Sequence, residues 1–164
     1  MEQNLSNPVI DFLREKKIPF RLFRHPGPIL SLEQAAMERG QSPNQVVRSI
    51  VFRIAKDEYV MVLMPGKRQV SWPALRQYLR KSRLSMASDE DVFQATGYQP
   101  GAISPFGLPK PIRILVDHLV LEQAEVSIGS GERGLTVILK TSDLLTALES
   151  FELEQFTTND QGIL

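Results

Sequence analysis

The chain has 164 residues, of which 42% are hydrophobic and 23% charged, a balance typical of one soluble globular domain. Its 19 basic and 19 acidic residues cancel, so the molecule as a whole does not attract nucleic acid, and the absence of cysteine excludes disulfides, a thiolate nucleophile and cysteine-ligated metals. No apolar run approaches the ~18 residues of a membrane span, and the start lacks a signal-peptide pattern. We therefore expect a cytoplasmic protein without a membrane partner.

Capping signals and apolar runs divide the first half of the chain. Asn7 before Pro8 predicts a helix start, and Ser31 with Gln34 three residues later predicts another. Lys56-Asp57 separates two β-branched runs, which predicts a hairpin. In chain order the predicted elements are a helix at 8–17, a strand at 20–24, a helix at 31–40, strands at 46–54 and 58–64, and a helix at 72–79.

The second half continues the alternation. Ser88 and Thr141 are predicted N-caps, and the glycine turn at 129–131 joins two β-branched runs. The predicted elements are a helix at 89–95, strands at 112–116, 125–128 and 135–139, and a helix at 142–148. We expect residues 1–150 to form a single domain and residues 151–164 a C-terminal tail, frayed from residue 152. The fold class is α+β, with a mixed, largely antiparallel sheet surrounded by helices.

The most unusual stretch runs from Gly97 to Pro111, with three glycines and four prolines. Proline excludes a helix there, while interspersed apolar residues such as Tyr98 and Phe106 favour burial. A loop that is both stiff and anchored exposes main-chain groups to a ligand. A long structural connection fits the composition equally well.

Familiar chemical motifs are missing from the sequence. There is no phosphate-binding GxxxxGK[ST], zinc-binding HExxH or hydrolase GxSxG pattern. Two histidines, His25 and His118, make a poor metal site without cysteines. A Ser-His-Asp triad could be assembled from any chain of this size and carries little weight.

Charge is unevenly distributed along the chain. Residues 66–83 hold six basic residues and no acidic one. Such a run can meet a phosphate backbone, or it can be a solvated helix face, which is the more frequent case.

Six blocks in succession resemble the YbaK/ProX family of aminoacyl-tRNA deacylases, relatives of the editing domain of bacterial prolyl-tRNA synthetases. The resemblance covers about residues 8 to 150, and its most specific part is the GxxxP element from Gly101 to Pro105. The blocks are HPGPILSLEQAA (25–36), VVRSIVFR (46–53), YVMVLMPGKRQV (59–70), GYQPGAISPFGL (97–108), ILVDHLV (114–120) and IGSGERGLTVILKTSDL (128–144).

The resemblance implies a barrel-like editing-domain fold and hydrolysis, in trans, of the ester that joins a wrong amino acid to the 3′ end of a tRNA. It implies no cofactor and no metal. The partners are then the acceptor end of a mischarged tRNA and an aminoacyl-tRNA synthetase. DNA is not a partner, since the sequence has neither a helix-turn-helix signature nor a net positive charge.

The family's functional lysine aligns with Arg48, a departure that leaves two alternatives open. Arginine supplies a positive charge but has a forked geometry and does not exchange its proton. The chain is then either a deacylase or a non-catalytic module that binds aminoacyl-tRNA or a synthetase. The catalytic residues implied are Arg48, Gly101, Ser104 and Pro105.

Other positions follow from the resemblance with less force. Asp117 fits a structural role, holding backbone N–H groups, better than a catalytic one. The glycines at 129 and 131 suit a pocket border or a plain hairpin equally well. The implied substrate-binding residues are His25, Ile29, Leu30, Ile103, Gly107, Asp117, Gly129 and Gly131. The implied tRNA-binding residues are Lys67, Arg68, Arg76, Arg80 and Lys81.

Overall fold

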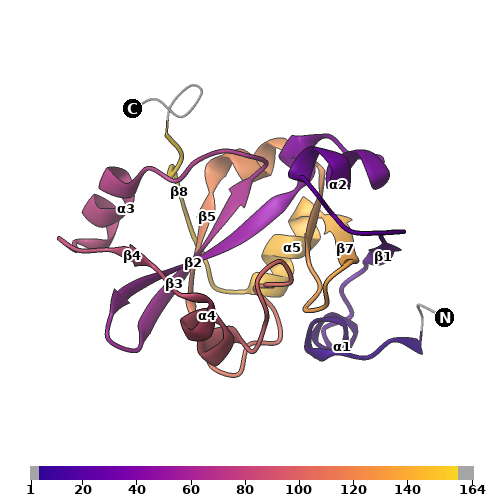
Figure 1. Cartoon of the computed structure of the whole chain (residues 1–164), viewed down its shortest axis with the longest axis horizontal. Helices are drawn as coiled ribbons and strands as arrows, with labels where there is room; N and C mark the ends of the chain where they lie inside the picture. Colours follow the sequence, from indigo (N-terminus) through magenta and orange to yellow (C-terminus); the bar gives the residue numbers. More distant parts are fainter. Residues whose placement is uncertain (1–3, 159–164) are drawn as a thin grey trace.

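The structure is a computed structural model that describes residues 4–158. Two β-sheets form its framework, with the β1–β7 pair at one end of the molecule and α3 at the other (Figure 1). One sheet has the strand order β1-β7-β6, and the other has the order β4-β2-β3-β5-β8. The strands are β1 (Arg21–Arg24), β2 (Val47–Ala55), β3 (Glu58–Pro65), β4 (Ser85–Met86), β5 (Arg113–Asp117), β6 (Glu125–Gly129), β7 (Leu135–Lys140) and β8 (Glu152–Glu154).

The sheets confirm the α+β, mixed and largely antiparallel prediction. Only the β3–β5 and β5–β8 pairs are parallel among the strand pairs within residues 4–158. The barrel-like expectation is wrong, because over the same residues neither sheet closes on itself. In the described part of the chain the two sheets are joined instead by one parallel bridge, between Val46 and Ser127.

The helices begin where the sequence places a capping side chain. Asn7 accepts a hydrogen bond from Ile10 N at 2.8 Å, and Ser31 accepts one from Gln34 N at 3.0 Å. Thr141 is the exception, because it is already the first helical residue and its hydroxyl donates to Gln123 O. The helices are α1 (Pro8–Glu15), α2 (Leu32–Glu38), α3 (Trp72–Leu79), α4 (Asp89–Thr96) and α5 (Thr141–Leu148), with 3₁₀ turns at Pro43–Gln45 and His118–Glu122.

The expectation of a frayed end from residue 152 is wrong for the described part of that segment. Strand β8 pairs with β5, and Phe156 beyond it is fully buried. Asp117 fixes this segment, since its Oδ2 accepts a hydrogen bond from Phe156 N at 2.8 Å. Residues 159–164 of the predicted tail lie outside the described residues.

Two apolar clusters divide the core. The larger one lies between the two sheets and α1, and includes Leu63, Val116 and Val137. The smaller one fills the space between the five-stranded sheet and α3, and includes Phe52, Leu75 and Phe156. The bridge that joins the two sheets thus lies at the border of a well-packed interior, which gives rigid walls to a cavity nearby.

Candidate functional site

A cavity of about 310 Å³ lies where the two sheets meet. Its walls come from the first half of β2, the facing ends of β6 and β7, and the loop after α4. The lining residues are Ile29, Arg39, Val46, Val47, Arg48, Ser49, Ile50, Gly101, Ile103, Ser127, Ile128, Gly129, Gly134, Leu135 and Thr136. We call this the junction cavity.

One wall of the junction cavity is a free strand edge. Strand β4 pairs with β2 only at Phe52 and Arg53, and β6 is bridged only at Val46, so residues 48–50 have no strand partner on that side among residues 4–158. The Val51 carbonyl faces this side, because it accepts a hydrogen bond from Ala87 N at 3.1 Å. Backbone direction alternates along a strand, so the main-chain groups of Ser49 face the same edge. This wall therefore offers main-chain donors and acceptors to a ligand.

A second wall is the glycine- and proline-rich loop, which is fixed against the β6–β7 turn. Gly131 N donates to Ala102 O at 2.9 Å. A Cβ built on Gly129 would lie 2.0 Å from the Ile103 carbonyl oxygen, so the close approach requires glycine. Gly101 has φ +85°, a conformation that favours glycine. The main chain at 101–103 is thus held in one position at the cavity.

The loop is fastened from behind by a buried tyrosine. The Tyr98 hydroxyl donates to the Phe106 carbonyl, and burial raises the pKa of Tyr98 to about 12. The phenol therefore stays protonated and available as a donor at neutral pH. Arg133 Nε fastens the front of the loop by donating to Pro100 O at 2.9 Å.

Arg48 lines the cavity but is already engaged with the main chain. Its Nε donates to Gly66 O at 2.6 Å, and its Nη2 donates to Arg68 O. Burial lowers the pKa of Arg48 below its ordinary value, yet the group stays charged at neutral pH. Arg48 therefore clamps the turn after β3 while it places a positive charge at the cavity.

A second guanidinium, that of Arg39, enters the same cavity from the end of α2. Its Nη1 donates to Ser127 Oγ at 2.8 Å, and its Nε donates to His25 Nε2 at 3.1 Å. His25 Nε2 is then an acceptor, so Nδ1 carries the proton and donates to Glu38 Oε1 at 2.6 Å. The hydrogen bond from His25, followed by that from Gln34, lowers the pKa of Glu38. Glu38 therefore remains a carboxylate that fixes the ring holding Arg39.

The electrostatics of the junction cavity are one-sided. Two guanidinium groups line it, and no carboxylate does among the residues placed by the structure. Nor does any group of three or more His, Cys, Asp or Glu in residues 4–158 suit a metal ion. The cavity can thus hold an electron-rich group and stabilise developing negative charge on an oxygen.

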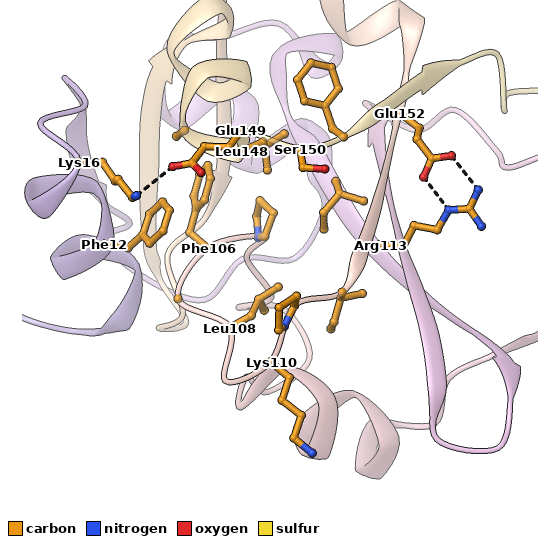
Figure 2. Close-up of a pocket in the computed structure, with 17 residues that line it drawn as sticks. Phe12, Lys16, Phe106, Leu108, Lys110, Arg113, Leu148, Glu149, Ser150 and Glu152 are labelled. Carbon is orange, nitrogen blue, oxygen red and sulfur yellow. Dashed lines mark hydrogen bonds and ion pairs between the residues drawn. The ribbon is translucent and has the colours of Figure 1, made fainter.

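The second half of the loop lines a different cavity, of about 520 Å³ (Figure 2). Pro105 and Gly107, which the resemblance placed at the substrate, lie here between α1 and the end of α5. Figure 2 shows the stacked rings of Phe12 and Phe106 on one side and the Arg113–Glu152 ion pair on the other. We call this the rear cavity, and the loop separates it from the junction cavity.

Several predicted site residues lie away from the junction cavity. Ser104 is fully buried, and its Oγ accepts a hydrogen bond from Phe106 N at 3.2 Å inside the loop. Asp117 is also fully buried and accepts hydrogen bonds from Leu119 N and Phe156 N, the structural role expected for it. Leu30 is 85% exposed. None of these three side chains lines the cavity.

The remaining predicted residues divide into lining and supporting ones. Gly131 packs on Tyr98, where an added Cβ would lie 2.9 Å from the ring. His25 lies behind Arg39 and does not line the cavity. The predicted residues that do line it are Ile29, Arg48, Gly101, Ile103 and Gly129.

The members of the predicted basic run differ in their local contacts. Lys67 pairs with Glu33 at 2.7 Å, and Arg68 uses its carbonyl to hold Arg48. Arg80 and Lys81 follow the end of α3. Arg76 alone of the five predicted residues lines a shallow depression of about 750 Å³. The lining residues of this depression are Arg53, Ile54, Ala55, Lys56, Arg76, Ser82, Arg83, Leu84 and Ser85, four of them basic and none acidic.

Sequence reasoning missed Arg39, Ser49, Ser127 and Thr136, all of which line the junction cavity. Arg39 is the C-cap residue of a short helix, a place where a basic side chain is ordinary. Ser127 and Thr136 are small polar residues inside apolar strand runs. Their polar side chains at positions where the strand pattern predicts apolar ones could have marked them as site residues.

Comparison with known proteins agrees with this architecture. Residues 26–147 match the family model described as "Aminoacyl-tRNA editing domain". A proline–tRNA ligase from Leuconostoc mesenteroides is 31% identical over 105 residues, which are 64% of this chain and 18% of the ligase. One from Limosilactobacillus fermentum is 32% identical over 109 residues, which are 63% of this chain and 19% of the ligase. The chain thus spans about a fifth of the length of these ligases.

A solved structure shares the fold over nearly the whole chain. It is described as a candidate trans-editing enzyme for prolyl-tRNA synthetase, with a TM-score of 0.84 and 21% identity, and the match covers 95% of this chain and 100% of that one. No helix in residues 4–158 is long and apolar enough to cross a membrane. The family match spans most of the chain and includes the loop and the three strands of the junction cavity, and on that basis the chain belongs to the aminoacyl-tRNA editing domain family.

Proposed function

We propose that the chain is an aminoacyl-tRNA deacylase that acts in trans and hydrolyses the ester of a mischarged tRNA in the junction cavity. One observation carries the proposal. The cavity combines a fixed main-chain wall at Gly101–Ile103 with the positive charge of Arg48. An activated ester needs a positioned water and a stabilised oxyanion more than it needs a protein nucleophile.

The proposed reaction is a simple hydrolysis. A water molecule attacks the ester carbonyl carbon, and the bond to the ribose oxygen breaks. The neighbouring ribose hydroxyl assists the transfer of the proton to the departing oxygen. The products are a free amino acid and a tRNA with an intact 3′ end. Main-chain groups of the loop and of the free β2 edge orient the ester.

The acceptor stem is proposed to lie along the basic depression. Arg48 and Ile54 are six residues apart on β2, so the two sites lie about 20 Å apart along that strand at ~3.4 Å per residue. Arg53, Lys56, Arg76 and Arg83 would meet phosphates there without reading bases. The protein is proposed to work in the cytoplasm, where charged tRNA is present.

A non-catalytic module that binds aminoacyl-tRNA or a synthetase is the second candidate. It is favoured by the two main-chain carbonyls that already occupy Nε and Nη2 of Arg48. A group held in this way serves as a static charge, which suits binding as well as turnover.

A deacylation assay separates the two candidates. The protein would be incubated with tRNA for proline mischarged with alanine or cysteine, and with correctly charged controls. Release of a wrong amino acid, lost in a Gly101→Val variant that still folds, is the expected result. Retention of the ester with tRNA bound would support the binding module. Neither release nor binding would contradict both candidates.

A further inference from the structure

The junction cavity contains hydrogen-bonding groups that the protein itself leaves without partners. Arg39 uses Nε and Nη1, while no residue in the described part of the chain accepts a hydrogen bond from its Nη2. Ser49 Oγ is buried and likewise has no partner within residues 4–158. Val47, Ile50 and Ile128 line the same cavity as Arg39.

Arg39 is also a partly desolvated cation. Burial lowers the pKa of Arg39 to about 10 against the opposing attraction of the Glu38 carboxylate, and no carboxylate forms a direct ion pair with it among the described residues. The adjacent Glu38 is directed to His25 and Gln34 instead. A desolvated charge is costly unless an opposite charge or several acceptors meet it. The arrangement is therefore completed by a ligand that brings an electron-rich oxygen.

The guanidinium is held in place before any ligand arrives. His25 fixes Nε, Ser127 fixes Nη1, and the Glu38 carboxylate fixes the histidine ring. Because the side chain is already ordered, binding does not have to order it, so its remaining donor selects strongly among ligands.

We propose that Arg39 determines the specificity of the site, selecting aminoacyl esters whose side chain ends in a hydrogen-bond-accepting oxygen, a carboxylate most of all. This inference rests on the proposed function and deepens it. Nη2 of Arg39 donates to the side-chain oxygen. Apolar side chains of the same size leave this donor unsatisfied and are rejected.

The test uses one tRNA charged with aspartate, asparagine or leucine, three side chains of similar size and different polarity. We expect kcat/KM for deacylation to fall in that order, with the aspartyl ester favoured over the leucyl ester by about 10- to 100-fold, the range expected for a hydrogen bond to a charged group. Arg39→Met should abolish or reverse this preference, and Arg39→Lys should keep part of it. Arg21→Met, a change at an exposed arginine paired with Glu125, is the matched control and should leave the ratio unchanged.

Non-hydrolysable 3′-amide analogues of aspartyl- and leucyl-adenosine give a second readout by calorimetry. Preference for the aspartyl amide that disappears in Arg39→Met supports the inference even if no ester is hydrolysed, in which case the deacylase proposal alone fails. Equal or better hydrolysis of leucyl or alanyl esters, with ratios unaffected by Arg39→Met, overturns the inference and leaves the deacylase intact. Circular dichroism of each variant confirms that its fold is retained.

Discussion

Gly129 has the closest approach of the described glycines to another main chain. An added Cβ would lie 2.0 Å from the Ile103 carbonyl oxygen, with main-chain atoms of the loop as the other neighbours. Main-chain atoms cannot rotate away from an added Cβ as a flexible side chain can, so a larger residue at this position must displace the whole loop. The width of the junction cavity is therefore set at this contact.

Gly129→Ala should displace the loop and reduce deacylation more than it reduces stability. The expected loss of unfolding free energy is about 1–3 kcal/mol, typical of overpacking, while kcat/KM falls at least tenfold by loss of alignment, since misplacement by about 1 Å can cost 10²-fold. Urea unfolding and the deacylation assay measure the two effects. Gly27→Ala is the control, because nothing lies within 4 Å of a Cβ there. Full activity of Gly129→Ala would show that the loop does not form the reactive wall.

Substitutions should separate two roles of Arg48, its positive charge at the cavity and its hydrogen bonds to the turn after β3. Arg48→Lys keeps the charge but cannot reach both Gly66 O and Arg68 O with a planar fork, so we expect deacylation within a few-fold of the parent and a lower urea midpoint. Arg48→Met loses both, with about 1.5–3 kcal/mol of stability and most activity lost. Equal activity of the parent and Arg48→Met would exclude an electrostatic role.

The family resemblance implied part of this site. It placed Arg48, Gly101, Ile103 and Gly129 at the substrate, and all four line the junction cavity, while their roles there stay a prediction. Arg39 was not expected there, because its contact with Ser127 spans 88 positions in the sequence and no local pattern records it. Asp117 shows the opposite case, in which an acidic residue at a strand end predicted its structural role from local chemistry.

At the scale of elements, one internal hydrogen bond of the loop from Gly97 to Pro111 involves a group that can titrate. The Tyr98 hydroxyl donates to the Phe106 carbonyl, and burial holds its pKa at about 12 against an ordinary value of 10.0. In the unfolded chain the phenol loses its proton near pH 10, whereas in the folded protein it does so near pH 12. Stability supplied by the neutral phenol is therefore complete below pH 10 and is lost between pH 10 and pH 12.

Tyr98→Phe should remove this contribution to the pH dependence. We expect the parent to lose about 2 kcal/mol more than the variant between pH 9 and pH 11.5, given ~1.4 kcal/mol per pKa unit. Urea midpoints of both proteins at half-unit steps test this. Parallel curves for the two proteins would mean that Tyr98 titrates alike in the folded and unfolded states.

The segment after α5 is an element that local sequence did not reveal. Its residues are mostly polar, and one of its two aromatic residues, Phe156, fills a site against Tyr78 with ring centroids 5.2 Å apart. A frayed end was predicted because the partners of Phe156 lie on α3 and β5, far away in the chain. The barrel-like expectation was wrong for a related reason. Apolar runs predict where strands form, but not which strand edges pair.

Phe156→Ala should therefore cost about 3–5 kcal/mol, as expected for a fully buried aromatic residue. It should also open residues 150–158 to proteolysis. Leu153→Ala on the same segment is the control, because Leu153 is 42% exposed. Urea unfolding and limited digestion with a protease that cleaves after glutamate, which can cut at Glu152 and Glu154, give the measurement. A change in stability as small as that of Leu153→Ala would mean that the segment is frayed, as the sequence predicted.

At the scale of the whole molecule, zero net charge conceals a local positive field. Arg53, Lys56, Arg76 and Arg83 face one depression without an acidic lining residue, whereas Lys67 is neutralised by Glu33. Field lines concentrate in such a depression, so association with a polyanion does not require a basic protein.

Replacing Arg53, Arg76 and Arg83 by Gln should weaken tRNA binding and flatten its salt dependence. The slope of log K against log salt should fall by about 0.9 for each lost contact with a duplex phosphate. Fluorescence anisotropy with labelled tRNA at several salt concentrations measures the slope. Lys67→Gln is the matched control and should leave it unchanged. An unaltered slope in the triple variant would place the acceptor stem elsewhere.

The loop from Gly97 to Pro111 forms a shared wall between two cavities. Gly101 and Ile103 face the junction cavity, whereas Pro105, Phe106 and Gly107 face the rear cavity shown in Figure 2. A substitution in the rear cavity, such as one at Leu108 or Leu148, would displace the loop and so change the main-chain wall of the junction cavity without contacting the ester. The selectivity of the junction cavity can therefore change during evolution through residues that do not contact the substrate. By the same route, a small molecule bound in the rear cavity would inhibit the reaction from a distance.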